Sequence, residues 1–216
     1  MKRVAFLSGW LRRAVFLLLL APVTLAQSAP AKPPSPKASP RPAPAVAPDE
    51  GTIHGQLYTS DYFGFRYTIP EGLEVQEDFL PSQQDAARRS FVLLAAYGRS
   101  ANPAYRQGVV ISADRNVYPA VKTAADYVAK TAREHFQPGG FEEIGAARAV
   151  TLGGHEFSRI DYRKGEIYQS LLATMWRGYV LSFDLVAPRL EEMETLAQSL
   201  QTLRFPPPKP KSPVLR

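Results

Sequence analysis

One stretch of the sequence concentrates side chains that could do chemistry. Residues 152–163 read LGGHEFSRIDYR and hold a histidine, four charged side chains and a tyrosine. A histidine next to a glutamate also begins the metal-binding motif of zinc proteases. That motif requires a second histidine four residues after the first, and Arg159 occupies this position. The stretch therefore does not match a zinc protease.

The pattern of the same residues predicts a β-strand over residues 155–163. Side chains alternate between the two faces of a strand. One face would carry His155, Phe157, Arg159 and Asp161, and the other Glu156, Ser158, Ile160 and Tyr162. Arg159 and Asp161 could form an ion pair, which contributes about 0–1 kcal/mol when it is exposed. We therefore interpret the stretch as a strand whose polar side chains face water, and not as a catalytic cluster.

Other catalytic templates are missing from the sequence. The histidines His54, His135 and His155 lack the spacing of metal ligands. No serine lies in a nucleophile elbow or an S-x-x-K pair, and no phosphate-binding or calcium-binding loop occurs. The absence of cysteine excludes disulfides, thiolate metal sites and a lipoprotein anchor. We expect no catalytic residue, no metal site and no cofactor, although polar residues could still converge in the fold to make a hydrolase.

The net charge of +6 comes from the two ends of the chain. Between Gly51 and Phe205 there are 16 basic and 18 acidic residues, a net charge of −2. A domain that binds nucleic acid should carry a positive stripe or patch on its folded surface. We therefore expect no nucleic-acid partner.

Composition divides the chain into four segments. Residues 1–26 have the basic start, apolar run and small-residue exit of a secretory signal peptide, with cleavage after Ala26. Residues 27–50 form a Pro/Ala-rich linker expected to be disordered, residues 51–205 the globular domain, and residues 206–216 a basic Pro-rich tail. The apolar run is shorter than the ~20 residues that span a membrane. An uncleaved anchor is the alternative, and only then would the chain be held in a membrane.

Within the domain, strand patterns precede and follow a first helical segment. Phe63, Phe65, Tyr67 and Ile69 alternate in a strand that ends at Pro70. Residues 71–88 are expected to be a loop, with a helical turn near 83–88. A helix is predicted from Thr123, which can form a capping box with Asp126, and Tyr127, Val128, Thr131 and His135 would share one of its faces. Strands are predicted near 146–152, 155–163, 166–176 and 179–187, separated by Gly153-Gly154, Lys164-Gly165 and Arg177-Gly178. A last helix after Pro188 carries a stripe of Leu190, Met193, Leu196, Ala197, Leu200 and Leu203. Antiparallel strands with separate helices predict an α+β fold, an antiparallel β-sheet with flanking helices.

The order of these elements resembles the PsbP-like family. The residues that carry the resemblance are Tyr58, Gly64, Phe65, Tyr67, Pro70, Gly153 and Gly154. The family includes the extrinsic oxygen-evolving protein of photosynthesis, the Ran-binding Mog proteins and exported bacterial domains of unknown role. The resemblance implies an α/β/α sandwich over residues 55–205. Leu73 stands where the family often has tryptophan, and no Ran-binding or photosystem-binding residue can be carried over.

These observations favour an exported, periplasmic or extracellular, non-catalytic binding or accessory module of a larger assembly. The expected partner is a protein or glycan of the cell envelope, and the oligomeric state stays open. The candidate binding residues are Tyr58, Tyr62, Phe63, His155 and Arg159. The aromatic members could dock a hydrophobic partner or a sugar ring. The alternative, which alternation favours, is that they fill the core.

Overall fold

The computed structural model describes Pro48 and residues 51–77, 89–100, 106–115 and 119–206. The expected signal peptide, most of the expected linker and tail, and a helical turn expected near Gln83–Arg88 lie outside the described residues. Within the described ranges, no helix has the length and apolar character needed to cross a membrane.

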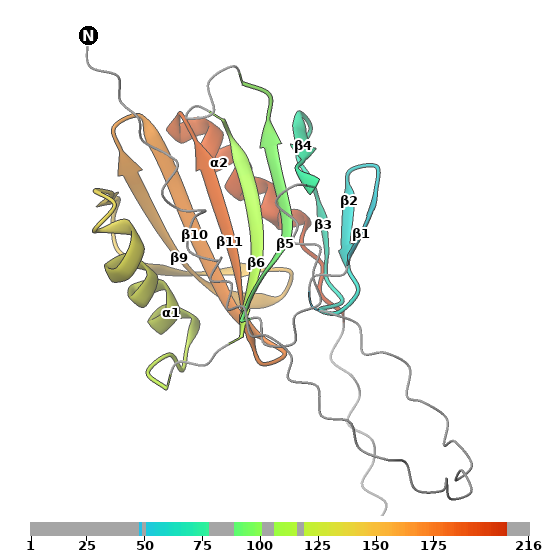
Figure 1. Ribbon diagram of the computed structural model, residues 1–216, viewed down its shortest axis with the longest axis horizontal. Coiled ribbons are helices and arrows are strands. Elements are labelled where there is room, and N and C mark those ends of the chain that lie inside the picture. Colours follow the sequence, from blue (N-terminus) through green and yellow to red (C-terminus); the bar gives the residue numbers. More distant parts are fainter. Residues whose placement is uncertain (1–47, 49–50, 78–88, 101–105, 116–118, 207–216) are drawn as a thin grey trace, which may run out of the picture. The chain divides into compact units, whose positions relative to one another are not determined.

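The centre of the domain is an antiparallel sheet of eight strands (Figure 1). Seven of them follow the order β4 (Leu73–Val75), β5 (Ser90–Gly98), β6 (Gly108–Arg115), β11 (Tyr179–Ala187), β10 (Ile167–Trp176), β9 (His155–Lys164) and β7 (Glu142–Glu143). The eighth, β8 (Arg148–Leu152), also pairs with β9. Most of the strands that pair with each other are consecutive in sequence, because β8 to β11 form a meander joined by tight turns.

The predicted meander is confirmed, with a shift at one turn. Lys164 pairs with Ile167, so the turn between β9 and β10 consists of Gly165 and Glu166, one residue later than predicted. The turn between β10 and β11 has positive φ at both central residues, 51° at Arg177 and 82° at Gly178. Positive φ at both positions is the geometry of a type I′ hairpin turn, whose twist matches that of the flanking strands.

A second sheet of three strands contains β1 (Gly51–His54), β2 (Leu57–Ser60) and β3 (Arg66–Thr68). The strand predicted through Phe63 to Ile69 was wrong in its extent, because Gly64 has a φ of 75° and belongs to the turn before β3. Phe63, Phe65, Tyr67 and Ile69 are nevertheless all buried, as their alternation predicted. The segment expected to be a loop after Pro70 also contains β4.

Two helices cover opposite faces of the main sheet (Figure 1). Helix α1 (Ala124–Thr131) continues into the π-helical turn η3 (Ala132–Phe136) and contacts β9 and β10. Helix α2 (Leu190–Ser199) continues into the 3₁₀ turn η4 (Leu200–Thr202) and contacts β10 and β11. The predicted α+β class, an antiparallel sheet between flanking helices, is confirmed.

The predicted inner face of the first helix was wrong in its second half. Thr123 and Asp126 form the predicted capping box, and Val128 is buried. The next inward residues are Ala132 and Phe136, not Thr131 and His135. Val128, Ala132 and Phe136 lie four residues apart, as on one side of a regular helix, so the inward face is displaced by one residue from the predicted Thr131 and His135. The helix then ends in a π-helical turn, in which Gln137 N–H bonds to the carbonyl of Ala132.

The larger core lies between the main sheet, the three-stranded sheet and α2. Of the predicted stripe on α2 and η4, Met193, Leu196, Ala197, Leu200 and Leu203 are buried. Leu190 is 41% exposed, so its prediction as a core residue was wrong. It is the first residue of the helix, at the end that projects beyond the packed side chains.

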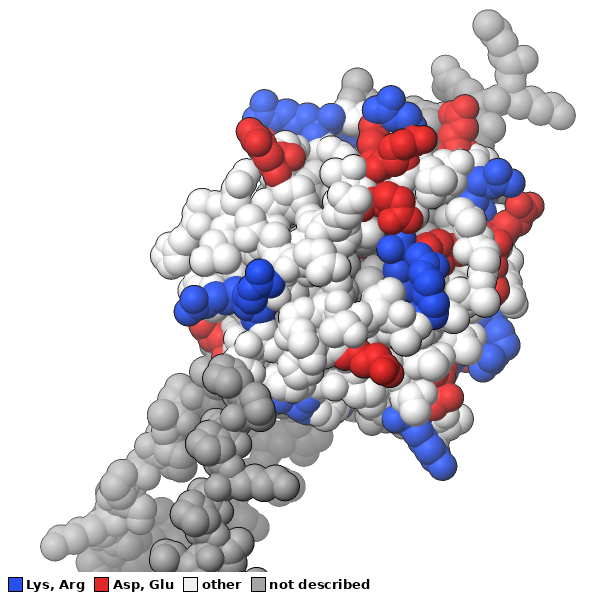
Figure 2. Space-filling model, turned by 180° about the vertical axis from the view of Figure 1, so that it is seen from behind, with Lys and Arg blue, Asp and Glu red and all other residues white. Residues whose placement is uncertain are grey.

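The surface of the domain mixes the two signs of charge. On the face seen in Figure 2, basic and acidic side chains are interspersed, and no basic stripe is visible among its described residues. That face therefore lacks the electrostatic footprint of a nucleic-acid-binding domain.

The polar side chains predicted to face water on β9 are instead buried under α2. Arg159 is 8% exposed and Asp161 5%. The Arg159 Nε donates to Asp161 Oδ1 at 2.8 Å and to Ser170 Oγ at 3.0 Å, and its Nη2 donates to Glu194 on α2 at 3.0 Å. Arg148 adds a bond to Asp161 Oδ2 at 2.7 Å. The interpretation as a solvated pair was therefore wrong, because α2 covers this part of the strand.

These bonds decide the ionisation of the buried carboxylate. Burial alone would raise the pKa of Asp161, but hydrogen bonds from Ser170, Arg159 and Arg148 outweigh it and lower the pKa below its ordinary value. Asp161 is thus a stable anion whose main partner is Arg159.

We expect Arg159→Met to destabilise the fold strongly. Breaking a buried ion pair by removing one partner costs roughly 3–5 kcal/mol, and Asp161 would keep only Arg148 as a cationic partner among the described residues. Urea unfolding monitored by circular dichroism measures this loss. The control is Arg163→Gln, which breaks the exposed pair with Glu142 and should change the free energy of unfolding by less than ~1 kcal/mol. Equal losses in the two variants would contradict a buried charge network.

Candidate functional site

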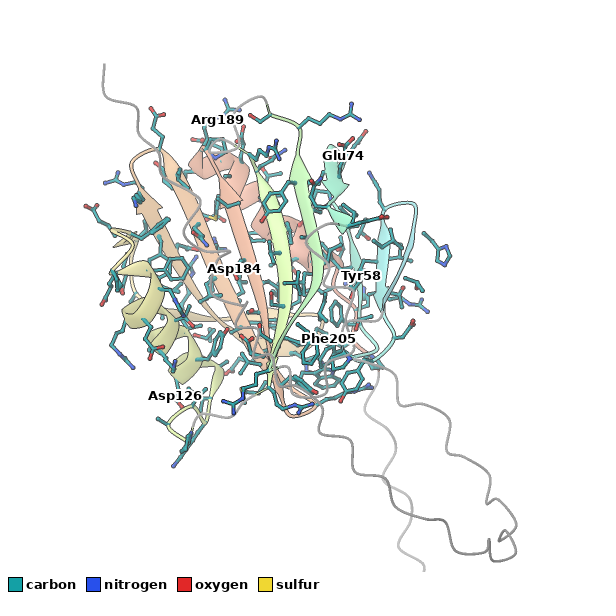
Figure 3. The ribbon with its side chains drawn as sticks, in the orientation of Figure 1. Tyr58, Glu74, Asp126, Asp184, Arg189 and Phe205 are labelled. Carbon is teal, nitrogen blue, oxygen red and sulfur yellow. The ribbon has the colours of Figure 1, made fainter. Side chains whose placement is uncertain are left out.

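Two hairpin turns bring aromatic side chains together at one end of the main sheet. Trp176 is the last residue of β10, Tyr179 the first of β11, and His155 the first of β9. The turn after β2 adds Tyr62 and Phe63, and the chain after η4 adds Phe205. We call this group the aromatic end: Tyr62, Phe63, His155, Trp176, Arg177, Tyr179 and Phe205. It lies around the labelled Phe205 in Figure 3.

The rings of the aromatic end contact one another edge to face. The His155 ring lies 4.5 Å from Trp176 and 4.3 Å from Phe205, measured between ring centroids. Tyr62 lies 4.8 Å from Phe63 and 5.8 Å from Tyr179 by the same measure. Such tilted and T-shaped pairs add stabilisation beyond the area that they bury. The rings thus form two contact groups, His155 with Trp176 and Phe205, and Tyr62 with Phe63 and Tyr179.

Hydrogen bonds to the backbone hold this group in place. Trp176 Nε1–H donates to the carbonyl of Phe63 at 3.0 Å. The Arg177 guanidinium donates to the carbonyl of Tyr62 and also lies 5.8 Å from the centre of the Trp176 ring. These bonds connect the β10–β11 turn to the turn after β2, although 115 residues separate Tyr62 from Arg177.

A glycine makes the close packing of Phe205 possible. Gly153 has a φ of 56°, and a Cβ added to it would lie 2.9 Å from both the Phe205 ring and the Leu203 carbonyl. The turn between β8 and β9 therefore needs glycine for its backbone conformation and for space.

The structure divides the five predicted binding residues into two groups. Tyr58 and Phe63 are 2% and 0% exposed, so they fill the core, as the alternative interpretation of the aromatic residues predicted. Arg159 is also buried, with its donors occupied by the charge network. Tyr62 and His155 are half-buried at the surface of the aromatic end. A binding role stays a prediction for Tyr62 and His155, the two of these five residues that reach the surface of the aromatic end.

Sequence reasoning missed Trp176, Arg177 and Phe205. For Trp176 and Arg177 the sequence did contain a signal, because they lie at a predicted hairpin turn. Turns at the same edge of a sheet lie close together. Phe205 had no such signal, since its position follows from the pairing of Arg204 with Arg66 beside β3.

A second polar group lies on the other face of the sheet, beside α1. The Tyr127 hydroxyl donates to the Asp114 carboxylate and so fastens α1 to β6. On the neighbouring strand β11, desolvation by burial raises the pKa of Asp184 to about 7, and the charge of Asp114 adds to this rise while a hydrogen bond from Gln169 opposes it. Asp184 (Figure 3) is thus a carboxyl group that titrates near neutral pH.

This titration predicts how stability depends on pH. The folded state binds the Asp184 proton more tightly than the unfolded chain, in which aspartate titrates near pH ~4. The protonated carboxyl therefore contributes its full stabilisation below about pH 4, and this contribution is lost as the pH rises through about 7. We expect Asp184→Asn to stabilise the protein relative to the wild type at pH 8, by roughly 1–3 kcal/mol, and not at pH 4.

Urea unfolding of the two proteins at a series of pH values tests this expectation. Asp161→Asn is a control with the opposite sign, because the pKa of Asp161 is lowered and its charge stabilises the fold above the ordinary aspartate range. A difference between wild type and Asp184→Asn that is constant from pH 4 to 8 would show that Asp184 does not titrate in this range.

Two clefts lie away from both groups, where β4 and β5 meet the start of α2. One has a volume of about 560 Å³ and the other about 410 Å³, and they share Glu74, Gly98, Arg99 and Ser100 in their walls. None of the predicted binding residues lines either cleft. Among the described residues, no three His, Asp or Glu side chains are arranged to hold a metal ion.

The fold and the aromatic end together define an α+β domain with an aromatic surface at one end of its sheet. A scan of protein-family models returned no match, and neither did a search of curated proteins. Solved structures with a similar fold include cyanobacterial PsbP from Synechocystis sp. PCC 6803, at 15% identity and a TM-score of 0.48 over 72% of this chain and 98% of that one.

Two further solved structures are similar at lower scores. PA94 of Pseudomonas aeruginosa, a protein of unknown function, is 22% identical with a TM-score of 0.38 over 68% of this chain and 92% of that one. LpqN of Mycobacterium tuberculosis, involved in cell envelope biogenesis, is 17% identical with a TM-score of 0.36 over 67% and 84%. The Mog-like part of the resemblance stays a prediction. The site is accordingly interpreted from its own residues.

Proposed function

We propose that this protein is an exported, non-catalytic binding module of an extracytoplasmic assembly, and that the aromatic end binds a protein partner. Tyr62, Trp176 and Arg177 are of the three residue types most enriched among the energetically dominant residues of protein interfaces. The Trp176 and Arg177 side chains bond to the backbone of the turn after β2, which fixes them before any partner arrives and lowers the entropy cost of binding.

The surroundings of His155 are the observation that carries the proposal. A hydrolase, the rival class, would require His155 in a pocket together with carboxylates. His155 instead contacts the rings of Trp176 and Phe205, and the two clefts are lined by other residues. An imidazole between apolar rings contributes contact area more readily than proton transfer. The arrangement therefore supports binding over catalysis.

Export rests on the first 26 residues of the sequence. Their basic start, apolar run and Thr24-Leu25-Ala26 exit favour cleavage and release over anchoring. The Pro-rich segments on both sides of the domain would then act as extended tethers, at ~3.1 Å per residue where they form polyproline II.

Mass spectrometry of the protein recovered from its native envelope tests the export step. We expect a chain that begins near Gln27. A mass that still includes Met1 to Ala26 would instead support the membrane-anchored alternative and end the proposal of a released module.

Site-specific photo-cross-linking in the native envelope tests the binding surface. We expect a photoreactive side chain at Tyr62 to capture one dominant protein product. The same group at Glu166, in the turn at the opposite end of β10, should capture none. Arg177→Asn should weaken the product, because asparagine tolerates the positive φ of this position and the turn is kept while the guanidinium is lost.

Two controls separate the possible outcomes. Arg163→Gln removes a guanidinium from an exposed edge and should leave the product unchanged. The experiment is repeated with the mature chain lacking residues 27–50 and 207–216. A product that forms only when these segments are present would show that the segments, and not the aromatic end, bind the partner. A product that resists protease but is degraded by glycan-degrading enzymes would show that the partner is a glycan. If no product forms at Tyr62, the proposal is wrong.

A further inference from the structure

The two clefts mark a second surface at the other end of the domain. Glu74 and Arg189, near these clefts, lie far along the sheet from Phe205 in Figure 3. The larger cleft reaches Gln107 and the start of α2 at Pro188 and Glu192, and the smaller one reaches Gln76 and Arg106. Volumes of about 560 and 410 Å³ are in the range of small-molecule sites.

The charges around the clefts leave one arginine uncompensated. The Arg99 guanidinium pairs with Glu74, and this pairing lowers the pKa of the Glu74 carboxyl. Arg189 pairs with Glu192 in the same way. No ion pair among the described residues involves Arg106, and within that part of the chain its Nε is buried without a hydrogen-bond partner. Among the described residues, the walls of the smaller cleft therefore hold an arginine that forms no ion pair.

A buried guanidinium nitrogen without a partner is costly. Nearly all buried polar atoms in proteins are hydrogen-bonded, and each exception calls for an explanation such as an absent ion or ligand. Arginine is also the side chain whose planar fork matches carboxylate and phosphate oxygens. An oxyanion in the cleft would satisfy Arg106 and would lie beside Arg99, which lines both clefts and is 85% exposed.

The remaining walls suit the hydroxyl groups of a sugar. The amides of Gln76 and Gln107 offer both donors and acceptors, and the carboxylate of Glu74 offers an acceptor. The first turn of α2 adds backbone N–H groups, because Arg189 at its N-cap makes no side-chain capping bond. A mixture of cationic, amide and carboxylate groups recognises polar, anionic ligands better than apolar ones.

We propose that these clefts bind the oxyanion group of a small polar ligand, a carboxylate or phosphate carried by a sugar, with Arg106 and Arg99 as its cationic contacts. The site goes beyond the proposed protein-binding surface, shares no residue with the aromatic end, and can be tested separately from it.

Ligand titration of the purified domain followed by NMR chemical shifts tests the proposal. The probes are inorganic phosphate, glucose 6-phosphate, glucuronate and neutral glucose. We expect the three anions to shift the backbone amides of Gly98, Ser100 and Gln107 in a saturable way, and glucose to leave them unchanged. Arg106→Gln should weaken the anion affinity by ~10-fold or more, as the loss of a hydrogen bond to a charged group does.

The variants are chosen so that a folding defect cannot imitate a loss of binding. Arg99→Gln alters a side chain that is 85% exposed, and it should also weaken anion binding while the unfolding midpoint stays unchanged. Arg177→Gln, at the aromatic end, should leave anion affinity unchanged. Saturation by phosphate and glucose 6-phosphate alone would show that the site recognises a phosphate group. Tighter binding of glucuronate would show that it recognises the carboxylate of a sugar acid. Shifts that are absent with every anion, or that are equal in wild type and both cleft variants, would overturn the proposal.

Discussion

The pairing of β10 with β9 on one side and β11 on the other is the constraint on which the rest of the structure depends. Ser170 is opposite Asp161, and Trp176 is opposite Tyr179. A slip of one residue would turn every side chain of a strand to the opposite face. The charge network under α2, the carboxyl group beside α1 and the aromatic end would all be lost together. The turns at Gly153-Gly154, Gly165-Glu166 and Arg177-Gly178 fix this register.

The two faces of the sheet shift the pKa of an aspartate in opposite directions. Under α2, Asp161 is surrounded by donors, so its pKa is lowered and it stays ionised. Beside α1, desolvation by burial raises the pKa of Asp184 to about 7, the charge of Asp114 adds to this rise, and a hydrogen bond from Gln169 does not outweigh it. The same residue type thus acts as a fixed anion on one face and as a titrating group on the other. Burial acts to raise the pKa of both carboxyl groups, and the donors around Asp161 reverse the shift there.

The two ends of the domain offer surfaces with different chemistry. The aromatic end presents half-buried rings held by backbone hydrogen bonds and one guanidinium. The clefts present paired arginines and glutamates, amides, and one arginine that forms no ion pair among the described residues. An aromatic surface suits a partner that buries apolar area, and the clefts suit a small polar anion. One rigid sheet separates them, so the domain can carry both functions without overlap.

The sequence by itself determined the elements that depend on neighbouring residues. Alternation predicted the faces of β9, glycine-containing pairs predicted the turns between β8 and β11, the second of them one residue early, and Thr123 with Asp126 predicted the start of α1. These features follow from backbone conformation and side-chain periodicity, which act over a few residues.

Only the tertiary structure decided which of these side chains meet and which are covered. Arg159 and Asp161 share a face in any strand, but their burial depends on α2, which begins about 30 residues later. His155, Trp176 and Phe205 meet because antiparallel pairing brings separate turns to one edge, and Arg106 lies in a cleft wall together with residues of β4 and of the end of β5. Such contacts depend on pairing and packing between distant segments, and local residue patterns carry no information on them.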